Sequence, residues 1–228
     1  MGKNDNGNNG RTELVFVVDR SGSMGGLESD TIGGFNSMLS KQRTIAGECR
    51  VTTLLFDHRI ETLHNHLDIR EVNDLTSRDY WVRGSTALLD AIGLAIDRMI
   101  VTQRHTAAAY RAQHVLFVII TDGYENASRR YSLHQIKQMI TYERERYHWE
   151  FVFLGANIDA EQTAGDFGIS PRCATDFHAA GQGIKASFEA VACAATAVRG
   201  GADLEDLNAP DFLGGVRDDY RSRRRMKR

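Results

Sequence analysis

A carboxylate and two hydroxyls stand at alternate positions directly after an apolar segment: Asp19, Ser21 and Ser23 follow residues 14–18. Five consecutive apolar residues, four of them β-branched or aromatic, predict a strand that is buried on both faces. Because side chains two residues apart in an extended turn can point the same way, these three oxygens can converge on one point. Oxygen ligands suit a hard cation, such as Mg²⁺, Mn²⁺ or Ca²⁺, better than zinc. An ordinary Asp/Ser turn at a strand end has the same pattern, so this segment alone leaves both interpretations open.

Two further oxygen donors lie at the ends of predicted elements, one after a strand and one before a helix. The apolar run of residues 115–120 predicts another doubly buried strand, and this run is followed by Thr121, Asp122 and a glycine. Thr86 precedes a segment in which apolar residues recur at helical spacing, with Ser85 as the expected N-cap and an end near residue 102. We therefore expect Thr86 at the exposed start of a helix and Asp122 at the carboxyl end of a strand.

The elements that must position these side chains alternate between strands and helices. Apolar periodicity predicts further helices over residues 27–45, 132–146, 159–167 and 181–198, and further strands over residues 50–57, 59–67, 151–154 and 173–177. This alternation predicts an α/β fold: a doubly wound, mostly parallel, Rossmann-like central sheet with helices on both faces and one antiparallel edge strand, residues 59–67. Ligands bind such sheets at the carboxyl ends of the strands, where the strand order reverses. In the order 3-2-1-4-5-6, the strands that precede Asp19 and Asp122 are neighbours at that point.

The order and placement of these five residues resemble the von Willebrand factor type A (VWA) domain. The resemblance rests on Asp19-x-Ser21-x-Ser23, on Thr86 within residues 84–93, and on Asp122 between Thr121 and Gly123. It covers about residues 12–198, nearly the whole part of the chain that we expect to be ordered. The segments 19–24 and 153–157 look like the bacterial cytosolic branch of the family.

The resemblance implies a metal-ion-dependent adhesion site formed by Asp19, Ser21, Ser23, Thr86 and Asp122. In the family the serines and the threonine usually touch the ion directly, and the acids act directly or through water. The implied ion is Mg²⁺ or Mn²⁺, with Ca²⁺ less favoured. The implied function is a non-enzymatic, metal-dependent protein-interaction module whose partner protein presents an Asp or Glu to the ion. The family's coupling would also link capture of the partner to movement of the last predicted helix, residues 181–198.

Two alternatives stay open at this point. An aspartate at the end of a first buried strand also fits a metal-dependent phosphohydrolase of the haloacid-dehalogenase type. That chemistry needs a second acid two residues later to protonate the leaving group, and Ser21 occupies that position. The other alternative is a protein of the same fold whose site binds no metal.

Several other polar side chains have both a functional and an ordinary interpretation. Glu125 could act as an additional acid at the site, but a solvated loop charge is the simpler expectation. Asp90 and Asp97 are expected to be exposed helix charges. His64 and His66 would share one face of the edge strand, where we expect a solvated hairpin rather than a transition-metal site.

Composition and charge indicate one sizeable domain. The chain has 228 residues, of which 42% are hydrophobic and 25% charged, with a formal net charge of −2. We predict a disordered N-terminal arm over residues 1–11, the VWA-like domain over residues 12–199, and a polar linker with a basic C-terminal tail over residues 200–228. The last twelve residues carry seven Arg or Lys and two Asp. Such a tail could touch nucleic acid or an acidic partner, although a disordered end is the simpler expectation.

The sequence favours a cytoplasmic protein without a membrane partner. No apolar run approaches the roughly 20 residues that span a bilayer, and the first eleven residues contain no apolar segment typical of a secretory signal. The three cysteines are widely spaced and odd in number, which favours reduced thiols over a disulfide framework or a zinc site.

Overall fold

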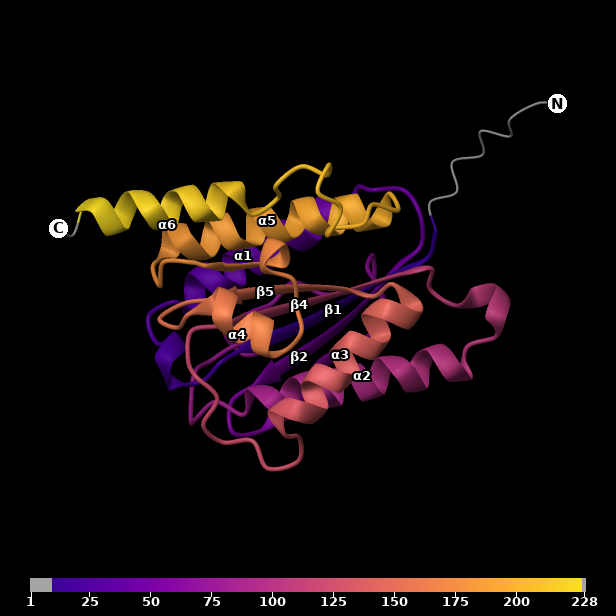
Figure 1. Cartoon of the computed structure of the whole chain (residues 1–228), viewed down its shortest axis with the longest axis horizontal. Helices are drawn as coiled ribbons and strands as arrows, with labels where there is room; N and C mark the ends of the chain where they lie inside the picture. The colour runs from indigo at the N-terminus through magenta and orange to yellow at the C-terminus, as the bar shows by residue number, and fades with distance from the viewer. Residues whose placement is uncertain (1–9, 227–228) are drawn as a thin grey trace.

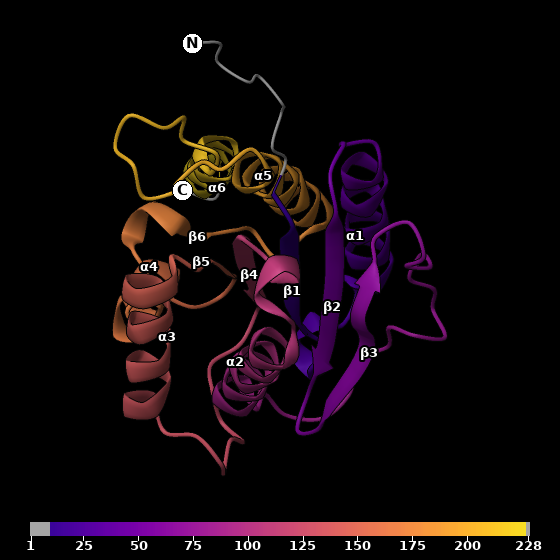
Figure 2. The same ribbon diagram turned by 90° about the vertical axis from the view of Figure 1, so that its right-hand side faces the viewer.

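Residues 10–226 are described by the structure, a computed structural model, and they form an α/β fold around one six-stranded sheet. The sheet has the order β3-β2-β1-β4-β5-β6, and its edge strand β3 runs antiparallel to β2 while all other pairs are parallel (Figure 2). The strands are β1 (Thr12–Asp19), β2 (Cys49–Phe56), β3 (Ile60–Asp68), β4 (His114–Thr121), β5 (Glu150–Gly155) and β6 (Ala174–Asp176). The predicted doubly wound fold is therefore confirmed, and the strands have the order 3-2-1-4-5-6, which makes β1 and β4 neighbours.

Helices cover both faces of this sheet. They are α1 (Glu28–Arg43), α2 (Leu88–His105), α3 (Leu133–Tyr147), α4 (Ala160–Asp166), α5 (Gly181–Arg199) and α6 (Gly214–Met226), with short 3₁₀ turns η1 (Gly22–Met24), η2 (Ala108–Tyr110) and η3 (Pro171–Cys173). Helices α1, α5 and α6 lie above the sheet in Figure 1, and α2 and α3 lie below it. No helix in residues 10–226 is long and apolar enough to cross a membrane.

The core is built on β1 and β4, the two central strands. All eight residues of β1 are buried, as are all residues of β4 except its first, because parallel neighbours and helices cover both of their faces. Aromatic contacts join this core to the upper helices, since Phe35 of α1 packs edge-on against both Phe16 and Phe188. A Cβ at Gly34 would lie only 2.4 Å from the Phe188 ring, so this glycine lets α1 and α5 approach closely.

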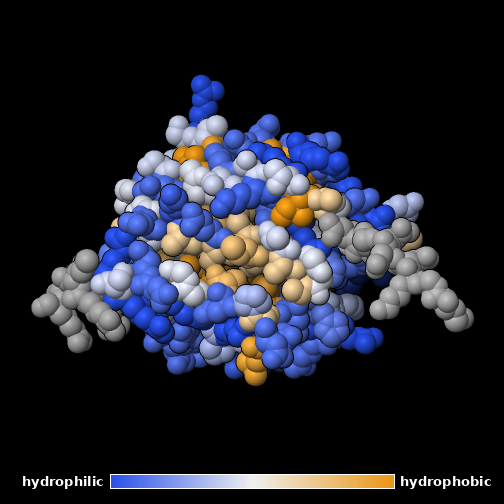
Figure 3. All heavy atoms as spheres, turned by 90° about the horizontal axis from the view of Figure 1, so that it is seen from above, coloured by the Kyte–Doolittle hydropathy of each residue, from blue (hydrophilic) through white to orange (hydrophobic). Residues whose placement is uncertain are grey.

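The upper helices also form a distinct surface. A groove of about 520 Å³ runs between α1 and α5, and residues lining it include Gly33, Met38 and Phe188. Seen from this side, the molecule has an apolar area in its middle surrounded by polar residues (Figure 3).

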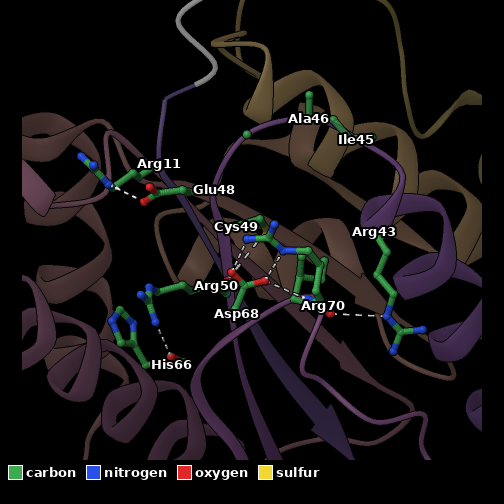
Figure 4. A network of polar contacts seen from close by, with 12 residues as sticks. Arg11, Arg43, Ile45, Ala46, Glu48, Cys49, Arg50, His66, Asp68 and Arg70 are labelled. Atoms are coloured by element: carbon green, nitrogen blue, oxygen red, sulfur yellow. Dashed lines mark hydrogen bonds and ion pairs between the residues drawn. The ribbon is translucent and has the colours of Figure 1, made fainter.

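Arginine contacts fasten the sheet at the amino end of β2. Arg11 pairs with Glu48, Arg70 pairs with Asp68, and Arg50 donates a hydrogen bond to the backbone oxygen of His66 (Figure 4). These charged groups lie at the end of the sheet opposite to the five candidate ligands, which follow the carboxyl ends of the strands.

The start of α2 differs from the sequence prediction. The helix begins at Leu88, its N-cap is Ala87 rather than Ser85, and no side chain caps it. Gly84 adopts a left-handed backbone (φ +67°), and the Ala87 amide donates to the backbone oxygen of Asp57, so the loop is fixed by β2 instead of by a serine cap. Thr86 consequently lies in this loop and is only 3% exposed, which corrects the expectation of an exposed position.

The C-terminal segment also differs from expectation. Residues 214–226 form α6, so the prediction of a disordered end is wrong for them. Leu213 and Val216 are buried, and the Arg217 guanidinium donates to three backbone oxygens around η3 and β6. Apolar contacts and satisfied arginine donors thus hold a helix in place despite its basic composition. The disordered arm predicted over residues 1–11 is wrong at Arg11, which pairs with Glu48 and donates to the backbone oxygen of Ala109. Residues 1–9 and 227–228 fall outside the described residues.

Candidate metal centre

The candidate site lies where β1 and β4 end side by side. Val18 pairs with Ile120 across the two strands, so Asp19 and Asp122 follow at the same edge of the sheet. The short turn η1 carries Ser23 and begins just after Ser21, while the loop before α2 brings Thr86 to the same edge. The Gly22 amide donates to the backbone oxygen of Gly84 at 3.1 Å, which joins these two loops directly.

Four of the five candidate side chains form a continuous chain of hydrogen bonds. The Thr86 hydroxyl donates to Ser21 Oγ at 3.0 Å, and the two serine hydroxyls share a hydrogen bond of 3.0 Å. Ser23 Oγ then donates to Asp122 Oδ1 at 2.5 Å. Residues separated by up to about one hundred positions along the chain therefore place their oxygens within contact of one another.

Asp19 joins this chain through the backbone of Ser21. Its Oδ1 accepts a hydrogen bond from the Ser21 amide at 2.7 Å, and its Oδ2 accepts one from the Thr121 hydroxyl at 2.6 Å. Burial raises the pKa of Asp19, and the bonds from Thr121 and Ser21 only partly oppose that effect. The sequence pattern did not single out Thr121 as a contact of the candidate site, although it showed that Thr121 precedes Asp122 at a strand end.

The Asp122 carboxylate is the least satisfied group of the site. It is 2% exposed, and its Oδ2 is buried without a hydrogen-bond partner. Burial, with a further contribution from the charge of Asp19, raises the pKa of Asp122 to about 6. A buried carboxylate oxygen without a partner is costly, and a cation at this position would remove the cost.

The surroundings leave room next to these oxygens. A Cβ at Gly123 would lie 3.2 Å from Ser23 Oγ and 3.3 Å from Thr86 Oγ1, so the glycine keeps the space between them open. The donor set of three hydroxyls and two carboxylates suits a hard divalent cation. In residues 10–226 there is no group of three or more His, Cys, Asp or Glu that could hold a metal ion, so a site here must use the hydroxyl oxygens.

Neighbouring polar groups hold the site from outside. Asn126 Oδ1 accepts a hydrogen bond from the Thr86 amide at 2.8 Å, and the Tyr80 hydroxyl donates to the backbone oxygen of Asp19 at 2.6 Å. Glu125 accepts bonds from the amides of Leu89, Ala127 and Ser128. It is therefore a loop-ordering group rather than a solvated charge.

Two other expectations for polar side chains are wrong for the same reason. Asp90 is buried and accepts hydrogen bonds from the amides of Arg129, Arg130 and Tyr131, so it is not an exposed helix charge. His64 is buried against Thr53, with 3.0 Å between His64 Nδ1 and the threonine hydroxyl, rather than solvated beside His66. Asp90 and His64 form hydrogen bonds with backbone amides and a buried hydroxyl. A local sequence pattern cannot predict such partners, because they lie far away along the chain.

Comparisons with known proteins give similarity of structure alone. No family model and no curated protein matches the sequence. Among solved structures, the chain is similar to proximal thread matrix protein 1 from the mussel byssus with a zinc-occupied MIDAS motif, at 15% identity and a TM-score of 0.58 over 82% of this chain. It is similar to the manganese-loaded TRAP protein of Plasmodium vivax at 15% identity and a TM-score of 0.53, over 78% of this chain and 72% of that one.

A third match carries the name of the fold. The von Willebrand factor type A protein from Catenulispora acidiphila aligns at 10% identity and a TM-score of 0.53, over 80% of this chain and 42% of that one. The chain spans less than half the length of the mussel protein, 46%. All three matches have TM-scores above 0.5, and the chain therefore has the fold of a von Willebrand factor type A domain.

Proposed function

We propose that Asp19, Ser21, Ser23, Thr86 and Asp122 hold a divalent cation, Mg²⁺ or Mn²⁺, and that the protein is a metal-dependent protein-interaction module. The observation that carries this proposal is the buried, unpartnered Asp122 Oδ2 at the end of a connected row of hydroxyls. Burying three hydroxyls and two carboxylates together costs free energy, because each polar group loses its contacts with water. A bound cation would offset this cost.

Each side chain has a distinct role in this proposal. Ser21, Ser23 and Thr86 offer neutral oxygens, while Asp19 and Asp122 offset the charge of the ion. Bound there, a hard cation with few charged protein ligands supplies an electrophilic position for a carboxylate from another protein. The mussel protein with its zinc-occupied MIDAS motif and the manganese-loaded TRAP protein support a divalent ion in a protein of this fold. The choice of Mg²⁺ or Mn²⁺ for this chain follows from its all-oxygen donor set.

The proposed partner is a protein that presents an aspartate or glutamate, and the proposed role is non-enzymatic. A haloacid-dehalogenase type of phosphohydrolase is disfavoured because Ser21 stands where a second acid would protonate the leaving group, and Ser21 is already bonded to Ser23 and Thr86. We also propose a cytoplasmic location, since Cys49, Cys173 and Cys193 are all free thiols.

Ion binding and partner capture can be tested separately. Isothermal titration with Mg²⁺ and Mn²⁺ should show one binding site in the wild type and none in a Ser21→Ala/Ser23→Ala double variant. Ser132→Ala is a matched control, because it removes a hydroxyl that caps α3 and is not one of the five candidate ligands. An immobilised protein should then retain acidic peptides in Mg²⁺ and release them in EDTA. Retention that survives EDTA and the double substitution would refute the proposal.

The same samples test whether partner capture moves α5. Hydrogen exchange of the α5 amides should change when Mg²⁺ and an acidic peptide are added together. Unchanged exchange would mean that the coupling is absent in this protein.

A further inference from the structure

A cluster of ionised side chains lies beside the candidate metal centre, and the proposed function gives it no role. Its centre is Asp57, which follows β2 and is 0% exposed. Its Oδ2 accepts a hydrogen bond from Arg83 Nε at 2.8 Å and one from Arg20 Nε at 3.1 Å. Its Oδ1 accepts one from the Arg59 amide at 2.8 Å, and His58 Nδ1 lies 3.0 Å away. One carboxylate thus contacts groups from three loops.

The two arginines connect this carboxylate to the ligand-bearing loops. Arg20 lies between Asp19 and Ser21, and Arg83 lies in the loop that carries Thr86. The Arg83 amide also donates to the backbone oxygen of Arg20 at 2.9 Å. The Ala87 amide donates to the backbone oxygen of Asp57 at 2.9 Å. Thr86 therefore lies between two residues that contact Asp57, Arg83 before it and Ala87 after it.

The centre of the cluster is buried, while its outer groups reach solvent: the side chains of Arg83 and His58 are 30% and 42% exposed, and Glu61, which pairs with Arg20 at 2.7 Å, is 55% exposed. The Arg20 side chain is 1% exposed, and its Nη1 is buried without a hydrogen-bond partner. The guanidinium groups of Arg20 and Arg83 lie 5.6 Å and 4.3 Å from the centre of the Trp81 ring. Burial opposes ionisation of Asp57, but the hydrogen bonds from Arg83 and Arg59 and the charges of both arginines outweigh burial and lower its pKa. The carboxylate is therefore ionised at neutral pH.

We propose that Asp57 is a positioning residue for the metal centre: through Arg20 and Arg83, its buried carboxylate fixes the loops that carry Ser21 and Thr86 in the arrangement that binds the ion. This inference rests on the proposed metal site. Asp57 touches none of the five candidate ligands through its own side chain, so its effect reaches the ion only through the geometry of the two loops. The exchange of an ionised carboxylate for an amide should loosen both loops while the sheet stays intact.

The test compares Asp57→Asn with a matched control, Glu13→Gln. Glu13 is also a buried acid, but it lies near the amino end of β1, where its Oε1 is 2.8 Å from His66 Nδ1. We expect Asp57→Asn to weaken Mg²⁺ binding by about 10- to 100-fold in isothermal titration, the usual effect of groups that orient metal ligands. Glu13→Gln should bind Mg²⁺ as the wild type does, whatever its effect on stability.

A second readout uses the metal-free protein. In Asp57→Asn the amides of Gly22, Arg83 and Ala87 should exchange hydrogen faster, while the amides of β5 keep their wild-type rates. A change confined to these loops separates positioning from a general loss of stability. If Asp57→Asn does not fold, Arg83→Gln serves instead, because Arg83 is partly exposed and the substitution should cause a similar loss of affinity.

The outcomes distinguish this inference from the proposed function. A wild type that binds Mg²⁺, with Asp57→Asn binding it equally well, would overturn the positioning role alone. A wild type that binds neither Mg²⁺ nor Mn²⁺ would overturn the metal site and the positioning role together. The double variant Asp57→Asn/Arg83→Gln should lose no more affinity than the single variant with the larger loss, because Arg83 acts on the site through its contact with Asp57. Additive losses would contradict the route through Arg83.

Discussion

Replacing Asp122 with asparagine removes the negative charge of this side chain while nearly keeping its shape, so it measures the free-energy cost of burying that charge. In the metal-free protein this carboxylate is buried, its Oδ2 has no partner, and the negative charge of Asp19 is close by. Asparagine has nearly the same shape but no charge. We therefore expect Asp122→Asn in EDTA to become more stable relative to the wild type as the pH rises from 4 to 7, although it should bind no Mg²⁺.

The magnitude follows from the pKa of Asp122, which burial raises from its ordinary value of 3.8 to about 6. A group with a raised pKa in the folded state stabilises the fold below the unfolded pKa, and this stability is lost as the pH rises through the folded pKa. The corresponding loss of unfolding free energy is about 0.5 kcal/mol at pH 4 and about 3 kcal/mol at pH 7. The new amide could leave a donor unpaired, at a cost of about 1–3 kcal/mol, but that cost does not depend on pH. We therefore compare the difference in unfolding free energy between Asp122→Asn and the wild type at the two pH values. This difference should change by about 2.5 kcal/mol from pH 4 to pH 7.

Urea denaturation in EDTA across this pH range measures the difference. Asp68→Asn is a control of opposite sign, because hydrogen bonds from Arg70 lower the pKa of Asp68 to about 2 and its ionised form stabilises the fold. Saturating Mg²⁺ at pH 7 should stabilise the wild type and leave Asp122→Asn unchanged, since the ion binds only the folded wild type. If the free-energy difference is the same at pH 4 and pH 7, burial does not destabilise the Asp122 carboxylate, and the electrostatic reason for a cation is wrong.

Three further substitutions test the site and the packing around it. Thr86→Val removes one hydroxyl at nearly constant volume, so Mg²⁺ affinity should fall at least about tenfold in isothermal titration while the circular dichroism spectrum is unchanged; full affinity would exclude Thr86 as a ligand. Gly34→Ala places a methyl group 2.4 Å from the Phe188 ring, and urea denaturation should show a loss of about 1–3 kcal/mol; an unchanged midpoint would show that α1 and α5 can separate freely. Ser132→Ala removes the capping box that Ser132 and Gln135 form at α3, and it should lower the unfolding free energy by about 1 kcal/mol without changing Mg²⁺ affinity; weaker ion binding would contradict the independence of α3 and the site.

The hydrophobic pattern of this chain predicted its strands and which of them lie at the centre of the sheet. The runs that became β1 and β4 contain almost no polar residue, and only central strands of a parallel sheet are buried on both faces. The alternating segment that became β3 could only occupy an edge, where one side stays exposed. Because parallel strands end at the same side of a sheet, the pattern also predicted Asp19 and Asp122 at one edge.

Local patterns failed where a side chain is satisfied by a distant partner. Ser85 has the residue type of an N-cap, but the Asp57 carbonyl holds the loop and α2 begins at Leu88. Asp90 reads as a solvated helix charge, but three amides from the loop before α3 bind it. The basic end of the chain reads as a disordered tail, but buried Leu213 and Val216 anchor α6.

By itself, the sequence determined the fold and the five oxygen donors that point to a cation, because both depend on residue type and on periodicity along the chain. Only the tertiary structure decided that Thr86 is buried, that Asp122 Oδ2 has no partner, and that Asp57 joins two arginines from different loops. Burial and hydrogen-bond pairing depend on residues far apart in the chain, and they exist only once the sheet has brought those residues together.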